Sequence, residues 1–166
     1  LSSPQAVAVD LSANPPIVYV ADTMTTRGLA WNDANGFASG AMADLVLGQK
    51  DLRSTVSYGT TNAPLSGFSS GLRLPVAVAV DGKGNVFVAD AGNNRIVRFP
   101  APFAQGDGAP VADLVIGQAD LVKNSFNLGQ NAPAANSVRT VAANGGSPFA
   151  VGLAFDGDGN LWFTDA

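Results

Sequence analysis

A short run of alternating Ala and Val recurs along the chain, and this repeat constrains the fold more than any other feature. Residues 4–10 (PQAVAVD) return as 75–81 (PVAVAVD), and a third time, stretched by two residues, as 148–156. Each copy is followed by a second apolar run ending in an aspartate, at Asp22, Asp90 or Asp165. Such self-similarity is typical of repeat architectures, in which one small unit packs on its neighbours.

Two of the copies continue into further matching segments. Residues 27–31 match 95–99, and 43–49 match 112–118, so each complete unit predicts four strands, which we call a to d. The a–b turns (DGKGN and DGDGN) supply the Gly and Asn residues that tight hairpins need. Four short antiparallel strands per unit are typical of a propeller blade. A two-sheet sandwich, the main rival, does not explain a repeat of four strands.

The sequence therefore predicts an all-β fold of β-propeller blades with long inserted loops between them. Within one domain spanning 1–166, the predicted parts are blade 1 (about 4–47), an insertion (48–74), blade 2 (about 75–116), an insertion (117–147) and a partial blade 3 (148–166). A ring usually has four to eight blades, so we expect missing blades or other copies of the chain to complete it. Helix is expected only in the two insertions, and none between 75 and 99.

Several residue types are missing, and their absence limits the chemistry of the chain. There is no His and no Cys, and all 13 acidic residues are Asp. A Ser-His-Asp triad, a thiolate nucleophile and the commonest zinc ligands are therefore excluded within these residues. The net charge of −4 argues against a nucleic-acid partner. No apolar run is long enough to span a bilayer, so we expect no membrane insertion.

The second unit carries a resemblance to a known family. Residues 74–99 (LPVAVAVDGKGNVFVADAGNNRIVRF) resemble an NHL repeat throughout, although Asn94 stands where the family often has His. The first copy is weaker, with Thr25 and Thr26 before Arg27. The fold of this family hosts enzymes, scaffolds and RNA binders, so the resemblance implies architecture more than activity.

Two functions are compatible with this resemblance. The first is a noncatalytic scaffold that binds a protein, peptide or glycan through its looped face; looped NHL arrays of this kind imply a secreted or periplasmic bacterial protein. The alternative is a propeller lyase or lactonase-like enzyme, since such relatives work at a metal in the channel using His, Glu, Asp or Asn. That enzyme would need residues from blades outside this chain. We expect neither a cofactor nor a metal here.

The two insertions share a sequence pattern that predicts order. Residues 48–52 and 62–64 recur in register as 117–121 and 131–133. Loops beyond about 12–15 residues are uncommon unless they are functional or disordered, and a disordered spacer has no reason to keep a register. In a four-stranded blade, each insertion emerges beside a b–c turn (23–26 or 91–94), so the insertions should share one face. We hypothesise that this face binds a partner.

Seven residues on this face are candidate ligand-binding residues: Arg27, Asn93, Asn94, Arg95, Gln49, Tyr58 and Gln118. A competing interpretation pairs the two arginines with Asp22 and Asp90 inside the blades. Under that interpretation Arg95→Ala costs about 1–3 kcal/mol of stability rather than binding. The insertions could likewise brace the blades. If they bind instead, replacing 53–70 by a Gly-Ser linker should keep the melting temperature and lose the partner.

The loop 156–160 places oxygens at alternate positions, as a calcium loop does. The equivalent loop of blade 2 has Lys83 at the middle ligand position, which favours a hairpin turn, and we expect no metal at Asp156, Asp158 and Asn160. The aromatic residues at repeat-equivalent strand positions are expected to pack between blades: Tyr19, Trp31, Phe87, Phe99 and Trp162.

Overall fold

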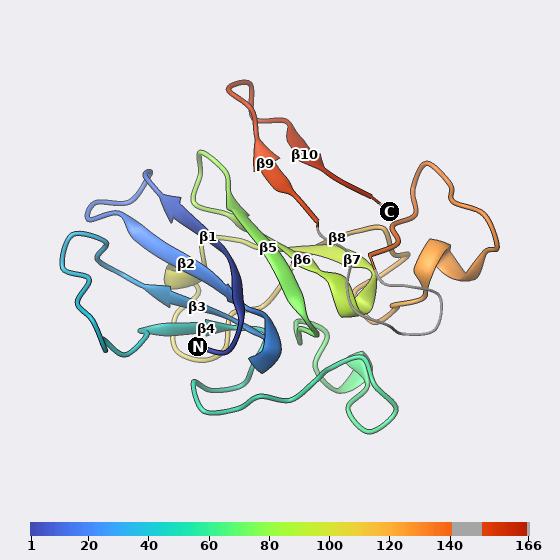
Figure 1. The fold of residues 1–166 in the computed structure, drawn as a ribbon, viewed down its shortest axis with the longest axis horizontal. Coiled ribbons are helices and arrows are strands. Elements are labelled where there is room, and N and C mark those ends of the chain that lie inside the picture. The colour runs from blue at the N-terminus through green and yellow to red at the C-terminus, as the bar shows by residue number, and fades with distance from the viewer. Residues whose placement is uncertain (141–150, 166) are drawn as a thin grey trace.

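The computed structural model describes residues 1–140 and 151–165, which form three antiparallel sheets that fan out side by side (Figure 1). Blade 1 has the strand order β1 (Pro4–Asp10), β2 (Ile17–Asp22), β3 (Arg27–Trp31) and β4 (Leu45–Leu47). Blade 2 repeats that order with β5 (Pro75–Val80), β6 (Val86–Asp90), β7 (Arg95–Phe99) and β8 (Leu114–Ile116). The hairpin of β9 (Leu153–Phe155) and β10 (Leu161–Phe163) is the third sheet. The predicted all-β fold and its four-stranded unit are confirmed.

Side-chain hydrogen bonds close the turn between the first two strands of a blade. In blade 2, the Asp81 carboxylate accepts hydrogen bonds from the backbone amides of Lys83 (2.8 Å) and Asn85 (2.9 Å). Gly84 takes a φ of +77°, which a residue with a side chain rarely adopts. The DGKGN sequence therefore forms the hairpin that the repeat predicts. The start of the third copy, 148–150, lies outside the described residues.

Short 3-10 turns occur both inside and outside the two insertions. Two lie in the insertions, η2 (Leu65–Gly67) and η5 (Phe126–Gly129), but three do not: η1 (Thr23–Thr25), η3 (Ala91–Asn93) and η4 (Pro102–Ala104). The expectation of no helix between 75 and 99 is therefore wrong. Because η1 and η3 occupy the same b–c turn and end at left-handed residues, Thr26 and Asn94, they belong to the repeat rather than contradict it. No helix of the described part is long and apolar enough to cross a membrane.

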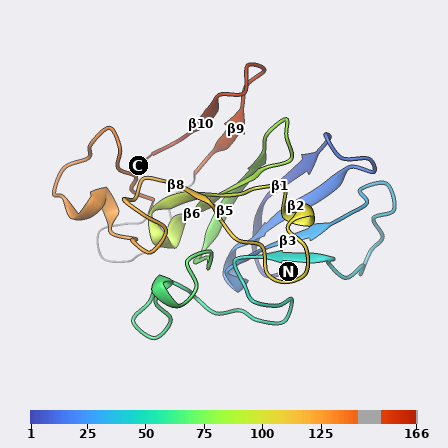
Figure 2. The ribbon, with the colours of Figure 1, turned by 180° about the vertical axis from the view of Figure 1, so that it is seen from behind.

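The inner strands β1, β5 and β9 lie side by side in that order (Figures 1 and 2). The main apolar core joins blades 1 and 2, and a smaller one joins blades 2 and 3. Side chains of a strand alternate between its two faces. Ala8 and Tyr19 of blade 1 pack toward blade 2, where Val78 and Phe99 meet them in the main core. Phe87 of blade 2 packs edge-on against Phe155 of blade 3, with ring centroids 5.0 Å apart. Blade 2 therefore buries apolar side chains on both faces, as its uninterrupted apolar strands predict.

The aromatic residues follow this packing with one exception. Tyr19, Trp31, Phe87 and Phe99 are buried, as the repeat predicts. Trp162 is 65% exposed, so the described residues do not bury it between blades. Its side chain lies on the face of blade 3 that points away from blade 2, and no described residue range supplies a further blade there.

Candidate functional site

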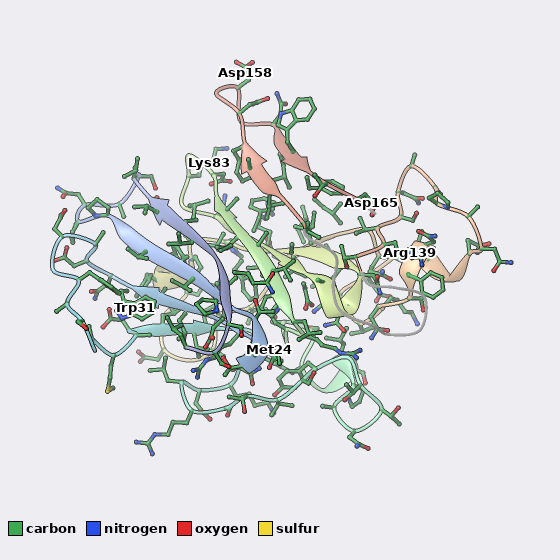
Figure 3. The ribbon with its side chains drawn as sticks, in the orientation of Figure 1. Met24, Trp31, Lys83, Arg139, Asp158 and Asp165 are labelled. Carbon is green, nitrogen blue, oxygen red and sulfur yellow. The ribbon has the colours of Figure 1, made fainter. Side chains whose placement is uncertain are left out.

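The two ends of the blades differ, and the insertions gather at only one of them. Lys83 and Asp158 mark a–b turns at one end, whereas Met24 marks the b–c turn of blade 1 at the opposite end (Figure 3). The b–c turns 23–26 and 91–94, together with the described parts of the insertions, 48–74 and 117–140, make up what we call the looped face.

A buried aspartate at the end of β6 organises the looped face of blade 2. The Asp90 carboxylate accepts hydrogen bonds from the backbone amide of Arg73 (2.7 Å), from Asn93 Nδ2 (2.8 Å) and from Arg95 Nε (2.7 Å). Burial raises the pKa of the Asp90 carboxyl, and the charge of Arg95 and these hydrogen bonds oppose that effect. Asp90 thus joins the end of the first insertion to the b–c turn and to β7.

The guanidinium of Arg95 is fully buried and holds both insertions. Its Nη1 donates to the Leu121 carbonyl (2.6 Å) in the second insertion. Its Nη2 donates to the carbonyls of Ser69 (3.2 Å) and Gly71 (2.7 Å) in the first insertion. Every nitrogen of the guanidinium is therefore committed to the chain itself, which leaves the arginine little capacity for an external anion.

Blade 1 repeats this arrangement with a more open arginine. Asp22 accepts hydrogen bonds from the Ser2 amide (2.5 Å), from the Thr25 hydroxyl and from Arg27 Nε (3.1 Å). Burial favours the neutral acid, but these hydrogen bonds outweigh it and lower the pKa of Asp22. Arg27 Nη1 donates to the Leu52 carbonyl (2.7 Å), which corresponds to Leu121, and the Arg27 side chain is 14% exposed. Both blades therefore contain the intrablade Asp–Arg pair.

A buried glutamine fastens the start of each insertion to the b–c turn of its own blade. Gln49 Nε2 donates to the carbonyls of Thr26 and Val56, both at 2.8 Å, and its Oε1 accepts from the Val56 amide (2.9 Å). Gln118 Nε2 donates in the same way to the Asn94 carbonyl (2.8 Å) and the Ser125 carbonyl (2.9 Å). The common register predicted for the two insertions is confirmed here.

The two insertions also contact each other. Asn124 Nδ2 of the second insertion donates to the Gly59 carbonyl of the first (2.8 Å). Gly59 has a φ of +88°, and a Cβ there would lie 1.8 Å from Asn93 Oδ1, so only glycine fits this junction. Beside it opens a cleft of about 360 Å³ between the insertions. Side chains that line it include Thr60, Pro64, Ser66, Val122 and Lys123.

The seven candidate residues lie on the looped face, but most of them lie beneath its surface. Asn93, Asn94, Arg95, Gln49, Tyr58 and Gln118 are buried, and Arg27 is partly exposed. Tyr58 packs edge-on against Phe68, with ring centroids 5.1 Å apart. Burial raises the pKa of the Tyr58 hydroxyl. In this structure these residues support the face, and none of them lines the cleft.

The cleft residues could not be predicted from the repeat pattern. Comparing repeats identifies residues that every blade needs, such as the arginines and glutamines. Thr60, Ser66 and Lys123 belong to the junction between two particular insertions, and no repeated pattern marks them. Their nearness depends on how two distant segments fold over the blades.

The structure changes one expectation about the insertions. Residues 53–70 include Ser69, whose carbonyl binds Arg95, and Ser70, whose hydroxyl accepts a hydrogen bond from the buried Ala112 amide (2.8 Å). Replacing 53–70 by a flexible linker removes these contacts, and we therefore expect the melting temperature to fall rather than stay unchanged.

The candidate calcium loop is a hairpin whose aspartate binds its own turn. Asp156 Oδ1 accepts from the amides of Asp158 (3.0 Å) and Asn160 (2.8 Å). Its Oδ2 accepts from Asn160 Nδ2 (3.0 Å) and from Trp162 Nε1 (2.8 Å). Among the described residues, no three acidic, His or Cys side chains are grouped so that they could hold a metal ion.

Because of these hydrogen bonds, we expect the Asp156 carboxyl to have a lowered pKa. The bond from the Trp162 indole, then those from Asn160, lower the pKa of Asp156 to about 2. The ionised form, and the hairpin contacts that need it, should therefore persist as the pH falls below the ordinary aspartate value of about 3.9 and be lost near the lowered value. A carboxyl-carbon NMR titration measures this pKa. Trp162→Phe removes the largest cause and should raise it; an unchanged pKa in that variant would contradict the assignment.

Comparison with known families agrees with this geometry. The family model of the NHL repeat matches residues 72–99, which run from the end of the first insertion through β5, β6 and β7. A search of the curated proteins finds no match to the chain. Residues 72–99 are therefore an NHL repeat, and the chain is an all-β, propeller-type array in which this repeat forms three of the four strands of blade 2.

Proposed function

We propose that the chain is a noncatalytic propeller scaffold whose looped face binds a peptide segment of a partner protein in the cleft between the two insertions. The observation that carries this proposal is the cleft itself, about 360 Å³ in volume, at the junction of Gly59 and Asn124. Surface loops on a rigid scaffold commonly carry binding function, and insertions on one face of a repeat protein are often its binding face.

The walls of the cleft are held in place before any ligand arrives. Arg95, Gln49 and Gln118 tie the insertions to the blades through buried hydrogen bonds. Ordering a loop on binding costs free energy, so walls that are already ordered favour affinity. The buried candidate residues therefore contribute by positioning the loops that a ligand contacts.

The lining of the cleft favours a peptide. Pro64 and Val122 offer apolar surface, Ser66 and Thr60 offer hydroxyls, and Lys123 offers a cation. This mixture suits an extended segment that carries an acidic side chain opposite Lys123.

A displayed random-peptide library, screened beside a glycan array, tests the proposal. We expect enrichment of acidic peptides that bind the wild-type chain, with affinity measured by calorimetry. Ser66→Trp, which fills the cleft from an exposed position, should abolish this binding. The matched control is Gln130→Trp, an exposed position in the second insertion outside the cleft lining, which should leave binding intact.

The other outcomes count against the proposal. Binding of the selected peptides that survives Ser66→Trp would place the site elsewhere. If the chain binds glycans and no peptide, the ligand is a glycan rather than a peptide. If it enriches neither, this face is not a binding surface.

A further inference from the structure

A hollow of about 200 Å³ lies between blades 1 and 2, at the end of the blades opposite the looped face. Its walls come from the a–b turns of both blades and from the loop that follows β7. Lys83, which marks this end in Figure 3, lines the hollow together with Asp10 and Tyr19. All four strands of each of these blades are present, so the hollow lies inside the array of blades.

The turn aspartate of blade 1 lacks a partner that its counterparts have. Asp81 Oδ2 accepts a hydrogen bond from Asn85 Nδ2 (2.8 Å) in blade 2. Asp156 Oδ2 accepts one from Asn160 Nδ2 (3.0 Å) in blade 3. In blade 1, Ile17 stands at the position of these asparagines, and its side chain has no hydrogen to donate. The repeat therefore leaves one carboxylate oxygen of blade 1 without its usual donor.

That carboxylate belongs to Asp10, which is only 4% exposed. Its Oδ1 accepts hydrogen bonds from the Ser12 amide (2.8 Å) and the Ser12 hydroxyl (2.6 Å). No residue in the described part of the chain donates to its Oδ2. A Cβ added to Gly84 would lie 3.1 Å from this oxygen, so Oδ2 lies against the a–b turn of blade 2. A buried acceptor without a donor costs free energy, which a bound donor would recover.

Tyr19 brings a second polar group without a partner to the same hollow. It is 1% exposed, and its hydroxyl has no hydrogen-bond partner among the described residues. Burial, and then the charge of Asp10, raises the pKa of this hydroxyl, so it is a neutral phenol that can donate and accept. At the same position of blade 3, Trp162 Nε1 donates directly to Asp156 Oδ2 (2.8 Å). The aromatic residue and the turn aspartate are thus bonded in blade 3 and not in blade 1.

The charges around the hollow favour a neutral ligand that carries hydroxyls. A cation would face Lys83 and an anion would face Asp10, and like charges brought together are unfavourable. A hydroxyl can donate to the Asp10 carboxylate and can also accept from Lys83 or Tyr19, which neither an ammonium nor a carboxylate can do. Ile17 and Phe103 add apolar walls, which suit the carbon-bound hydrogens of such a ligand.

We propose that this hollow binds a neutral polyhydroxylated small molecule of monosaccharide size, with hydroxyls bonded to Asp10 Oδ2 and to the Tyr19 hydroxyl. The volume of about 200 Å³ is several times the ~30 Å³ of one water molecule and lies below the ~300–1,000 Å³ of sites for drug-sized ligands. This site lies at the opposite end of the blades from the proposed peptide cleft and does not depend on it.

Saturation-transfer NMR of the wild-type chain tests the proposal, with D-glucose, D-galactose, D-mannose and myo-inositol as neutral probes and with ethanolamine and acetate as charged ones. We expect at least one neutral probe to bind and to shift the backbone amides of Ser12 and Gly84, and neither charged probe to do so. Asp10→Asn should weaken that binding by about tenfold or more, and Tyr19→Phe by about two- to tenfold, because each weakens a hydrogen bond to the ligand.

Unfolding measurements separate a role in binding from a role in packing. Tyr19→Phe removes a hydroxyl that has no partner, and Phe87 fills the same position in blade 2, so the variant should melt no lower than the wild type. Ser66→Trp alters the looped face alone and is the matched control, which should bind the neutral probe as the wild type does.

Four results would each overturn the proposal. Binding of a charged probe alone would make the ligand class wrong. Binding of no probe would mean that the hollow holds water only. Binding that survives both Asp10→Asn and Tyr19→Phe, or that Ser66→Trp abolishes, would place the ligand elsewhere. A Tyr19→Phe variant with a lowered melting temperature would show that the hydroxyl serves the packing of the blades.

Discussion

Replacing Arg95 by alanine is expected to lower the free energy of unfolding by about 3–5 kcal/mol, the range for removing one partner of a buried ion pair. This exceeds the loss of about 1–3 kcal/mol expected from the sequence, because both partners are fully buried. The Arg95 and Asp90 side chains are both fully buried, with 2.7 Å between Nε and Oδ2. The substitution leaves the Asp90 carboxylate buried without its cation. It also strips the donor from three carbonyls, including Leu121 and Gly71. Urea unfolding followed by circular dichroism measures the loss.

The matched control is the equivalent change in blade 1. Arg27 is partly exposed, and Asp22 keeps its hydrogen bonds from Ser2 and Thr25 when the arginine is removed. Arg27→Ala should therefore cost only about 1–2 kcal/mol. Equal losses for the two variants would mean that burial does not set the importance of the pair. An Arg95→Ala variant as stable as the wild type would contradict the structural role altogether.

Replacing Gly48 by alanine should destabilise the chain by about 2–5 kcal/mol, because strain and overpacking add. Gly48 follows β4 and has a φ of +79°. A Cβ there would lie 2.3 Å from Leu72 Cγ and 2.7 Å from Leu72 Cβ. Leu72 is fully buried, and a rotamer change cannot move its Cβ away. Thermal and urea unfolding of the variant measure the loss.

The Gly40→Ala variant separates the cost of backbone strain from the cost of overpacking. It has a similar φ of +81°, but nothing lies within 4 Å of the Cβ that alanine would add. Gly40→Ala should therefore cost only the backbone strain, about 1–2 kcal/mol. The difference between the two variants gives the cost of the contact with Leu72. If Gly48→Ala is no worse than Gly40→Ala, the insertion does not pack against the end of β4 as the structure shows.

The repeat explains how much of the fold could be predicted from the sequence. Strands, turns and blade order follow from local patterns that recur, such as the alternating Ala and Val of 75–80 and the Gly84 turn. The Asp–Arg pairs were predictable for the same reason, since Arg27 and Arg95 each follow their aspartate by five residues in the sequence. A recurring residue indicates a need that every blade shares.

Features that depend on the neighbourhood of one blade were not predictable in this way. Trp162 has the same sequence context as Tyr19 and Phe87, and only the arrangement of whole blades decides that it is exposed. The cleft depends on the contact between Gly59 and Asn124, which lie in different insertions. The 3-10 turns at Thr23–Thr25 and Ala91–Asn93 were missed because their geometry follows from placing each arginine opposite its aspartate, which no local propensity expresses.

The described parts of the insertions, 48–74 and 117–140, are ordered parts of the propeller face that buried side chains hold in place. Native-state hydrogen exchange of their amides tests this order most directly. The amide of Val56 donates to Gln49 Oε1 (2.9 Å), and that of Arg73 donates to Asp90 Oδ1 (2.7 Å). We predict that both amides are protected to within about tenfold of those of β6, since they open only when the blade does. Exchange of Val56 and Arg73 at the rate of an unstructured peptide, while β6 stays protected, would contradict the account.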